Sequence, residues 1–398
     1  VTGVQTCALP ILADALDAFF FLTVVAAFAA VAVFAAVAVF AAVAVFAAVA
    51  VFDVAAMPYV CAAKLLLPPE IMLLALLASG CLALLVIALA LLVATARPGG
   101  GPGVLGGVPG GPALAPGNGF PGRFFGPFMD TSMGGARWKG CPCPVVALGF
   151  VLAGSDGRPA WNGNQPLDAM KSLVASMRAA GKEPICSFGG EAGTELGSVI
   201  KDAGALAKAY LAVIDAYAFK WADFDIEGAA YQDVETCRRR NQALAIVQRQ
   251  RPGLTVSYTF PSEAAGLPAA CVATLAHAKT VGLRVDVCNL MTMFFGGSQP
   301  AMGQTCIRAA TGAHAQCGLP MGICPNIGVN SGPGDVFQLR DAQAVVDFAR
   351  RTPWVRWLAF WSVDRDRAGP GGGTSAQNNA SGVAQGDYGF SKVFAQFR

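Results

Sequence analysis

Three acidic residues alternate with apolar residues in the second half of the chain. Asp223, Asp225 and Glu227 are separated by Phe224 and Ile226. In a β-strand alternate side chains share a face, so the three acids point one way and the two apolar residues the other. Burying carboxylates costs several kcal/mol for each ion. A solvated edge strand is the alternative, but the helical patterns on both sides favour burial and therefore a chemical role.

Crowded carboxyl groups favour acid catalysis. Neighbouring carboxylates raise one another's pKa, so that one of them stays protonated near neutral pH. A protonated carboxyl group in a cavity acts as a general acid. Glu227 lies nearest to the carboxyl end of the predicted strand. The pattern predicts proton donation to a leaving group, and cleavage of a glycosidic bond is a reaction that needs such an acid.

The elements around the acids predict a β/α architecture. Short apolar runs predict strands at residues 124–129, 145–152, 183–188, 224–227, 254–260, 285–293, 321–329 and 355–363. Helical periodicity fills several gaps, at residues 167–180, 203–218, 234–250, 269–281 and 339–350. Eight strands that alternate with helices favour a TIM-type (β/α)8 barrel. A doubly wound open sheet is the alternative, but no glycine-rich fingerprint follows the first strand.

The first 97 residues differ sharply in composition from the rest. Residues 71–96 contain no charged residue, and about 20 apolar residues suffice to cross a bilayer as a helix. We therefore interpret residues 71–96 as a transmembrane helix. Residues 1–55 contain an apolar repeat with a period of six, which fits neither a helix face nor a heptad. This repeat is more typical of a tandem nucleotide repeat than of selected packing, so we exclude it from the fold prediction.

A glycine- and proline-rich segment at residues 97–119 separates the apolar part from the predicted barrel. Ten Gly and five Pro lie between Pro98 and Gly119. This composition buries no core and is typical of a flexible tether. We therefore expect one domain at residues 120–398, preceded by hydrophobic, membrane-associated segments.

Charge and cysteine content argue against two classes of function. The formal net charge is +3, too dilute for the basic face that nucleic acid requires, so we expect no nucleic-acid partner. The cysteines lack the spacing of a zinc site, so we expect no metal and no cofactor. Cys186 and Cys288 are predicted to be buried thiols. Cys306 and Cys317 are predicted to pair if the domain faces an oxidising compartment.

Several motifs together resemble those of the family 18 glycoside hydrolases, which are chitinase-type barrels. The matching runs are Phe-Gly-Pro-Phe-Met-Asp at 125–130, Ser-Phe-Gly-Gly at 187–190, Asp-Phe-Asp-Ile-Glu-Gly at 223–228, Asn-Leu-Met-Thr-Met at 289–293 and Phe-Trp-Ser at 360–362. They resemble, in order, the first, third, fourth, sixth and eighth strands of that family. The opening run resembles the compact, bacterial-type branch.

The resemblance implies hydrolysis of β-1,4-linked N-acetylglucosamine, in chitin or its oligosaccharides, by a retaining and substrate-assisted mechanism. Glu227 would be the general acid and base, Asp225 would hold the acetamido group of the substrate, and Asp223 would tune Asp225. The candidate substrate-binding residues are Trp361, Tyr258, Met291, Phe128 and Gly190. A barrel with this activity would lie outside the cell, so we expect a membrane-anchored or secreted protein.

Two positions depart from the family pattern. Lys220 stands where the full signature has a further Asp, and we expect it to neutralise part of the acid cluster. Met293 and Phe294 stand where the family carries Tyr-Asp or at least Asp, which would lower activity unless Tyr258 substitutes. The alternative function is therefore a chitin- or oligosaccharide-binding protein of weak or no activity on the same barrel. A membrane structural protein would leave the acids unexplained.

Overall fold

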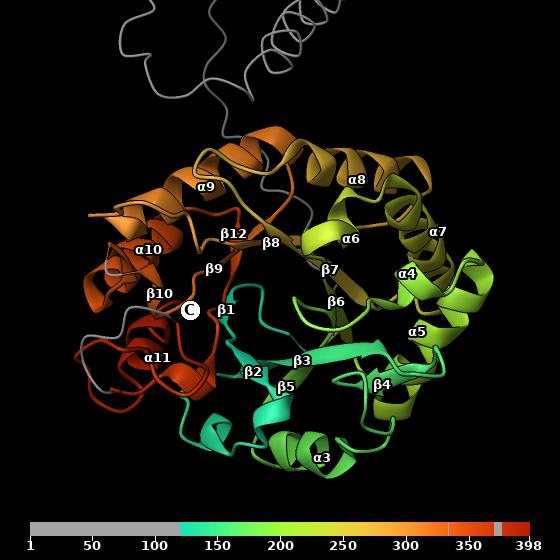
Figure 1. The fold of residues 1–398 in the computed structure, drawn as a ribbon, viewed down its shortest axis with the longest axis horizontal. Coiled ribbons are helices and arrows are strands. Elements are labelled where there is room, and N and C mark those ends of the chain that lie inside the picture. Colours follow the sequence, from blue (N-terminus) through green and yellow to red (C-terminus); the bar gives the residue numbers. More distant parts are fainter. Residues whose placement is uncertain (1–119, 333, 370–375) are drawn as a thin grey trace, which may run out of the picture. The chain divides into compact units, whose positions relative to one another are not determined.

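The computed structural model describes residues 120–332, 334–369 and 376–398. These residues form a ring of parallel strands that is surrounded by helices (Figure 1). The strands of the ring are β1 (Phe124–Phe125) with β2 (Phe128–Asp130), β3 (Val145–Ala153), β5 (Glu183–Gly189), β6 (Trp221–Asp225), β7 (Thr255–Pro261), β8 (Val287–Met291), β9 (Met321–Cys324) and β12 (Val355–Leu358). The prediction of a TIM-type barrel is confirmed.

The barrel closes through its first strand, which is divided into two short pieces. β1 pairs in parallel with β12, and β2 pairs in parallel with β3. Gly126 N donates to Leu358 O at 2.9 Å, and Phe128 N donates to Phe360 O at 3.0 Å. The break falls at Pro127, which has no N–H to donate. The ring therefore continues across a point where the sequence predicted one uninterrupted strand.

The outer helices follow the strands in alternation. They are α3 (Lys171–Ala179), α5 (Ala203–Tyr217), α7 (Val234–Gln250), α8 (Ala269–Thr280), α9 (Met302–Cys317), α10 (Leu339–Arg351) and α11 (Gly389–Phe394). Asp233 caps the start of α7. Its carboxylate accepts from the N–H groups of Glu235 and Thr236, each at 3.1 Å, which satisfies donors that a helix start leaves free. The sequence did not predict α9.

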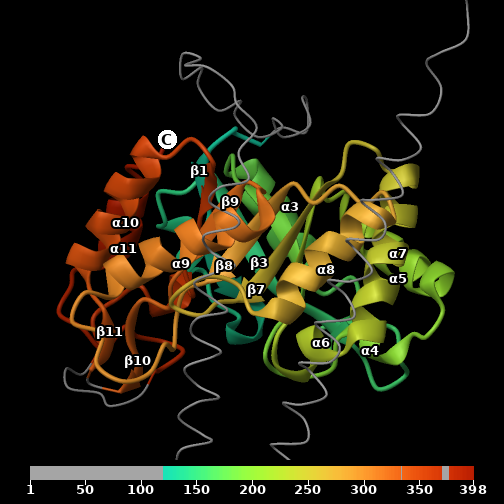
Figure 2. The same ribbon diagram turned by 90° about the horizontal axis from the view of Figure 1, so that it is seen from above.

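Short additional elements follow the strands at their carboxyl ends. They are α4 (Leu196–Val199) after β5, α6 (Gly228–Gln232) after β6, and the hairpin of β10 (Gly328–Gly332) and β11 (Asp335–Phe337) after β9. Figure 2 shows α4, α6 and this hairpin on the same side of the barrel. This is the face on which active sites of TIM-type barrels lie.

Two layers of apolar side chains hold the barrel together. One lies between the strands and the helices, and the other fills the barrel interior. In the interior, the ring of Phe124 stacks with Trp357 at 6.1 Å and meets Trp221 edge-on at 5.4 Å. The barrel is therefore a packed core and not a pore.

The predicted disulfide between Cys306 and Cys317 is wrong. Both residues belong to α9 and are eleven positions apart, which corresponds to about 16 Å along a helix. A disulfide needs Cα atoms within about 7 Å. The nine cysteines among the described residues are free and buried, and the prediction of buried thiols at Cys186 and Cys288 is confirmed.

The predicted repeat at residues 1–55, transmembrane helix at 71–96 and linker at 97–119 lie outside the described residues. Within residues 120–332, 334–369 and 376–398, no helix has the length and apolar character needed to cross a bilayer.

Candidate active site

The three predicted acids lie together inside the barrel. Asp223 and Asp225 are buried on β6, whereas Phe224 and Ile226 pack in the layer between the strands and the helices. Glu227 follows the end of the strand with an extended backbone, φ −121° and ψ 173°, so the alternation of side chains continues to this residue. The structure therefore forms one column of carboxyl groups that ends at the active-site face.

Asp223 lies deepest in this column and is surrounded by hydroxyl groups. Ser187 donates to its carboxylate at 2.8 Å, Ser257 at 2.5 Å, and Thr259 at 2.9 and 3.0 Å. Burial raises the pKa of Asp223 to about 6, and these hydroxyl groups oppose the rise. Ser187 and Ser257 stand beside Asp223 in register on β5 and β7. The sequence did not predict this ring of hydroxyl groups, because single strands do not reveal their register.

Asp225 and Glu227 follow Asp223 towards the end of the column, and each affects the pKa of the other. Burial raises the pKa of Asp225 well above its ordinary range, and the negative charges of Glu227 and Asp223 raise it further. Burial also raises the pKa of Glu227 to about 7, the charge of Glu191 adds to the rise, and a hydrogen bond with Asp225 lowers it. Asp225 Oδ1 has no hydrogen-bond partner among the described residues. The pair therefore retains a proton near neutral pH and leaves one acceptor free.

The pair lines a cavity of about 620 Å³ at the carboxyl ends of the strands. This volume lies within the usual range of ligand pockets. Of the predicted substrate-binding residues, Trp361 and Met291 line the cavity. Glu191 and Asn162 also line it, and neither was predicted from the sequence. Glu191 directly follows the Ser-Phe-Gly-Gly motif, and this position next to the motif could have identified it as a candidate site residue.

Trp361 presents a partly exposed ring to the cavity and is held by a second aromatic ring. It stacks on Phe150 with ring centroids 5.6 Å apart and an angle of 12°. Phe128 does not line the cavity and is only 1% exposed. Its ring stacks on Trp357 at 5.6 Å inside the barrel. Phe128 therefore supports the aromatic platform from within, and the prediction that it contacts substrate is corrected.

The two glycines at the end of β5 permit a close approach of two strands. Gly189 and Gly190 have φ angles of 102° and 91°, which residues with a side chain rarely adopt. Gly190 N donates to Asp225 O at 2.9 Å. A Cβ on Gly189 would collide with that same carbonyl oxygen, and a Cβ on Gly190 would lie 2.7 Å from the Phe150 ring. Gly190 therefore makes room for the platform and does not itself line the cavity.

Tyr258 does not reach the cavity. Its side chain is fully buried, its hydroxyl donates to Asn241 Oδ1 at 2.6 Å, and its ring stacks on Phe260 at 4.8 Å. Because Ser257 and Thr259 face Asp223 on the inside of β7, the residue between them faces the helices. The prediction that Tyr258 binds substrate, or replaces a missing polar group, is therefore corrected.

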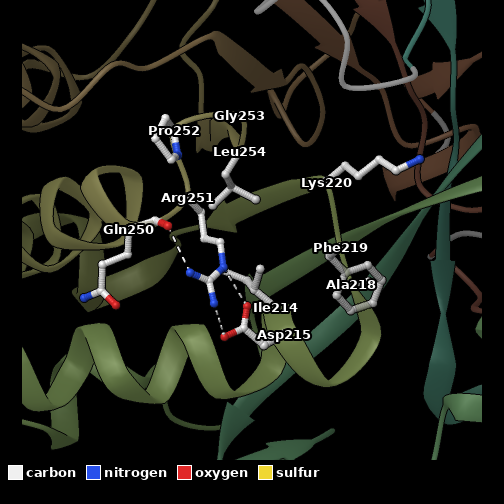
Figure 3. Close-up of a pocket in the computed structure, with 10 residues that line it drawn as sticks. All are labelled: Ile214, Asp215, Ala218, Phe219, Lys220, Gln250, Arg251, Pro252, Gly253 and Leu254. Carbon is white, nitrogen blue, oxygen red and sulfur yellow. Dashed lines mark hydrogen bonds and ion pairs between the residues drawn. The ribbon is translucent and has the colours of Figure 1, made fainter.

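Lys220 lies at the opposite end of β6 from the cavity. Its ammonium group is 3.4 Å from the carboxylate of Glu183. It lines a second cavity of about 850 Å³, shown in Figure 3, where it extends away from the ion pair of Arg251 with Asp215 at 2.7 Å. The expectation that Lys220 neutralises the acid cluster is wrong, because its partner is Glu183. This larger cavity includes none of the three predicted acids.

The wall of the active-site cavity that follows β8 is largely apolar. Met291, Met293 and Phe294 line it. Phe294 is 52% exposed with φ of 53°, and its N–H donates to Asn330 Oδ1 at 3.2 Å. A ligand in the cavity would meet thioether and aromatic groups along this wall.

The acids of the cavity are not arranged as a metal site. Among the residues that the structure describes, no group of three or more His, Cys, Asp or Glu side chains is placed to hold an ion. The neighbours of Asp223 are hydroxyl donors, and burial raises the pKa of both Asp225 and Glu227. Such a set of groups suits proton transfer.

The chain is similar in sequence to two chitinases. It is 30% identical over 257 residues to a "probable bifunctional chitinase/lysozyme" of Escherichia coli (strain K12), a match that covers 58% of this chain and 28% of that protein. It is 29% identical over 223 residues to endochitinase 11 of Metarhizium anisopliae, with 50% of this chain and 42% of that protein covered. The chain thus spans less than half the length of either protein. No model of a known protein family matches it.

The fold is similar to that of a solved chitinase domain. The catalytic domain of a hyperthermophilic chitinase from Pyrococcus furiosus matches with a TM-score of 0.64 and 32% sequence identity, over 72% of this chain and 97% of that domain. The barrel matches nearly all of that catalytic domain, and it carries a column of acids at the active-site face. These two features together indicate a glycoside hydrolase fold. The chain belongs to the chitinase-like proteins of glycoside hydrolase family 18.

Proposed function

We propose that this barrel hydrolyses β-1,4-linked N-acetylglucosamine polymers, that is, chitin or its oligosaccharides, with retention of configuration. One observation carries the proposal: the carboxyl groups of Asp225 and Glu227 line one cavity with Trp361, and burial raises the pKa of both. The similarity to the Pyrococcus furiosus chitinase domain supports the choice of substrate.

Glu227 supplies the proton. Its pKa of about 7 keeps a large fraction of the carboxyl group protonated near neutral pH, as a general acid requires. Glu227 donates this proton to the glycosidic oxygen as the bond to the anomeric carbon breaks. Once the leaving sugar has departed, the resulting carboxylate accepts a proton from the incoming water.

Asp225 positions the acetamido group of the substrate. Its Oδ1 has no partner among the described residues, and an amide N–H of the sugar would provide one. That hydrogen bond directs the acetamido carbonyl oxygen towards the anomeric carbon, where it displaces the leaving group. Water then opens the cyclic intermediate from the opposite side, and two inversions give retention.

The pKa of Asp225 supports this assisted route. A retaining enzyme whose own carboxylate is the nucleophile needs that carboxylate ionised. Burial and the charges of Glu227 and Asp223 raise the pKa of Asp225 well above its ordinary range, so Asp225 is poorly suited to that role near neutral pH. The acetamido oxygen of the substrate is therefore the nucleophile in the proposed mechanism.

Hydrolysis of a chitin oligomer ladder tests the proposal. The unaltered chain should release shorter oligomers in the β configuration, measured by NMR immediately after cleavage. Glu227→Gln removes the transferable proton and should lower the rate by about 10²–10⁴-fold. Glu235→Gln removes an exposed acid of α7 that pairs with Arg238 at 3.1 Å, and it should cleave normally. No cleavage by the unaltered chain under any condition would refute the proposal.

A binding protein without turnover is the second candidate, and the apolar wall favours it. Met293 and Phe294 provide no hydroxyl or carboxylate to the substrate. This candidate expects oligomers to bind equally well to the unaltered chain and to Glu227→Gln, with no products from either. In both cases Trp361→Ala should weaken binding about tenfold, or about 1.4 kcal/mol, in calorimetry.

A further inference from the structure

A fourth carboxylate lies in the cavity with no role in the steps above. Glu191 follows β5 and lines the same cavity as Asp225 and Glu227. Its side chain is exposed, and within the described part of the chain no hydrogen bond or ion pair involves its carboxylate. An acid without a partner beside a catalytic acid raises the energy of ionising its neighbour.

The backbone places Glu191 next to the end of β6. The preceding residues, Gly189 and Gly190, have φ angles of 102° and 91°, and Gly190 N donates to Asp225 O at 2.9 Å. These contacts tie the chain to the end of β6, two residues before Glu227. The start of the loop that carries Glu191 is therefore attached to the strand that carries the catalytic pair.

The other titratable groups near Glu227 have different partners or lie deeper. They are Asp130 at the end of β2, Asp223 and Asp225 on β6, Cys324 at the end of β9, and Arg365 of the 3-10 turn η3 (Val363–Arg365). Asp130 accepts from Ser132, and Arg365 donates to backbone carbonyl groups of residues 327 and 329 at 2.8 and 3.0 Å. The short helix α6, which begins directly after Glu227, carries no charged residue.

We propose that Glu191 is a positioning residue whose negative charge keeps on Glu227 the proton that is to be donated. The catalytic purpose of this charge rests on the proposed hydrolysis, whereas the titration that tests the charge needs no substrate. The proposed role agrees with the direction in which the charge of Glu191 shifts the pKa of Glu227, upward and second only to burial. Because Glu191 is exposed, added salt screens its charge.

Direct titration of Glu227 tests the inference without any substrate. The full chain is labelled with ¹³C at glutamate carboxyl groups, and the Glu227 signal is assigned by its loss in Glu227→Gln. In Glu191→Gln the pKa of Glu227 should fall by roughly half a unit, the size expected for one charge across a partly solvated gap. Glu191→Asp, which keeps the charge, should restore most of the shift. Glu235→Gln should leave it unchanged.

Activity gives a second readout if the chain is a chitinase. The alkaline limb of kcat should move to lower pH by the same half unit in Glu191→Gln, with about a 2.5-fold loss of rate at pH 7.5. Added salt should move the limb in the unaltered chain and leave it fixed in Glu191→Gln.

The two proposals fail in different ways. An unchanged Glu227 titration in Glu191→Gln overturns the inference about Glu191, whatever the enzymatic activity. A shifted titration in a chain that cleaves no chitin oligomer supports the inference and removes the proposed hydrolysis. A shift of equal size in Glu235→Gln would show that total charge is responsible, and it would also overturn the inference.

Discussion

Removing the charge of Glu227 should stabilise the fold at alkaline pH. The pKa of Glu227 is about 7 in the folded protein, against an ordinary value of 4.5. At 1.36 kcal/mol for each pKa unit, ionised Glu227 costs the folded state up to about 3 kcal/mol. Below pH 4.5 the group is protonated in both folded and unfolded states and costs nothing. Stability falls as the pH rises from 4.5 to 7, and above pH 7 the full cost remains.

Glu227→Gln abolishes this dependence on pH. Relative to the unaltered chain, its free energy of unfolding should be higher by up to about 3 kcal/mol at pH 8 and by much less at pH 5. At about 2–4 °C for each kcal/mol, the melting temperature at pH 8 should rise by several degrees. Urea unfolding of both chains at the two pH values measures the difference. An equal effect of the substitution at pH 5 and pH 8 would show that Glu227 holds no extra proton when folded.

Three further substitutions, with one control, test the framework around the acids. Gly189→Ala combines a positive φ with a collision against β6, so calorimetry should show that the free energy of unfolding falls by more than about 3 kcal/mol. The control Gly134→Ala has a φ of 61° but free space around the new Cβ, so its free energy of unfolding should fall by only about 1 kcal/mol. Arg240→Ala leaves Glu195 buried without the partner now at 2.9 Å, and urea unfolding should show a loss of about 3–5 kcal/mol. Thr259→Val removes a hydrogen-bond donor to the buried carboxylate of Asp223. The free energy of unfolding should therefore fall by about 1–3 kcal/mol at pH 8 and by less at pH 5, where Asp223 is protonated.

The column of acids was predictable because it depends on one strand alone. A period of two places Asp223, Asp225 and Glu227 on one face without knowledge of any neighbour. The helix α7 was equally accessible, and its observed bounds match the prediction at residues 234–250. By contrast, α9 contains Gly and Thr, which are weaker helix formers, and few large apolar side chains that would mark a helix face.

The parts that were missed depend on contacts between strands. Tyr258 was expected in the site, yet register places Ser257 beside Asp223 and so turns Tyr258 outward. Phe128 was expected to contact substrate, but its ring packs among the aromatic side chains of the barrel interior. Pairing partners and the depth of a cavity arise from the closed barrel. A single sequence shows which residues share a face, and it does not show what that face meets.

The two departures from the family pattern have unequal consequences, because they lie at opposite ends of the barrel. Lys220 pairs with Glu183 at the entrance of β6, where it contacts neither the cavity nor the acids. Phe294 lies on the cavity wall itself and is half exposed. Under the proposed hydrolysis, a sugar beside Phe294 would lack the polar contact that the family pattern implies for the transition state, and it would meet an apolar surface in the ground state. We therefore expect this exchange to lower kcat more than it weakens binding.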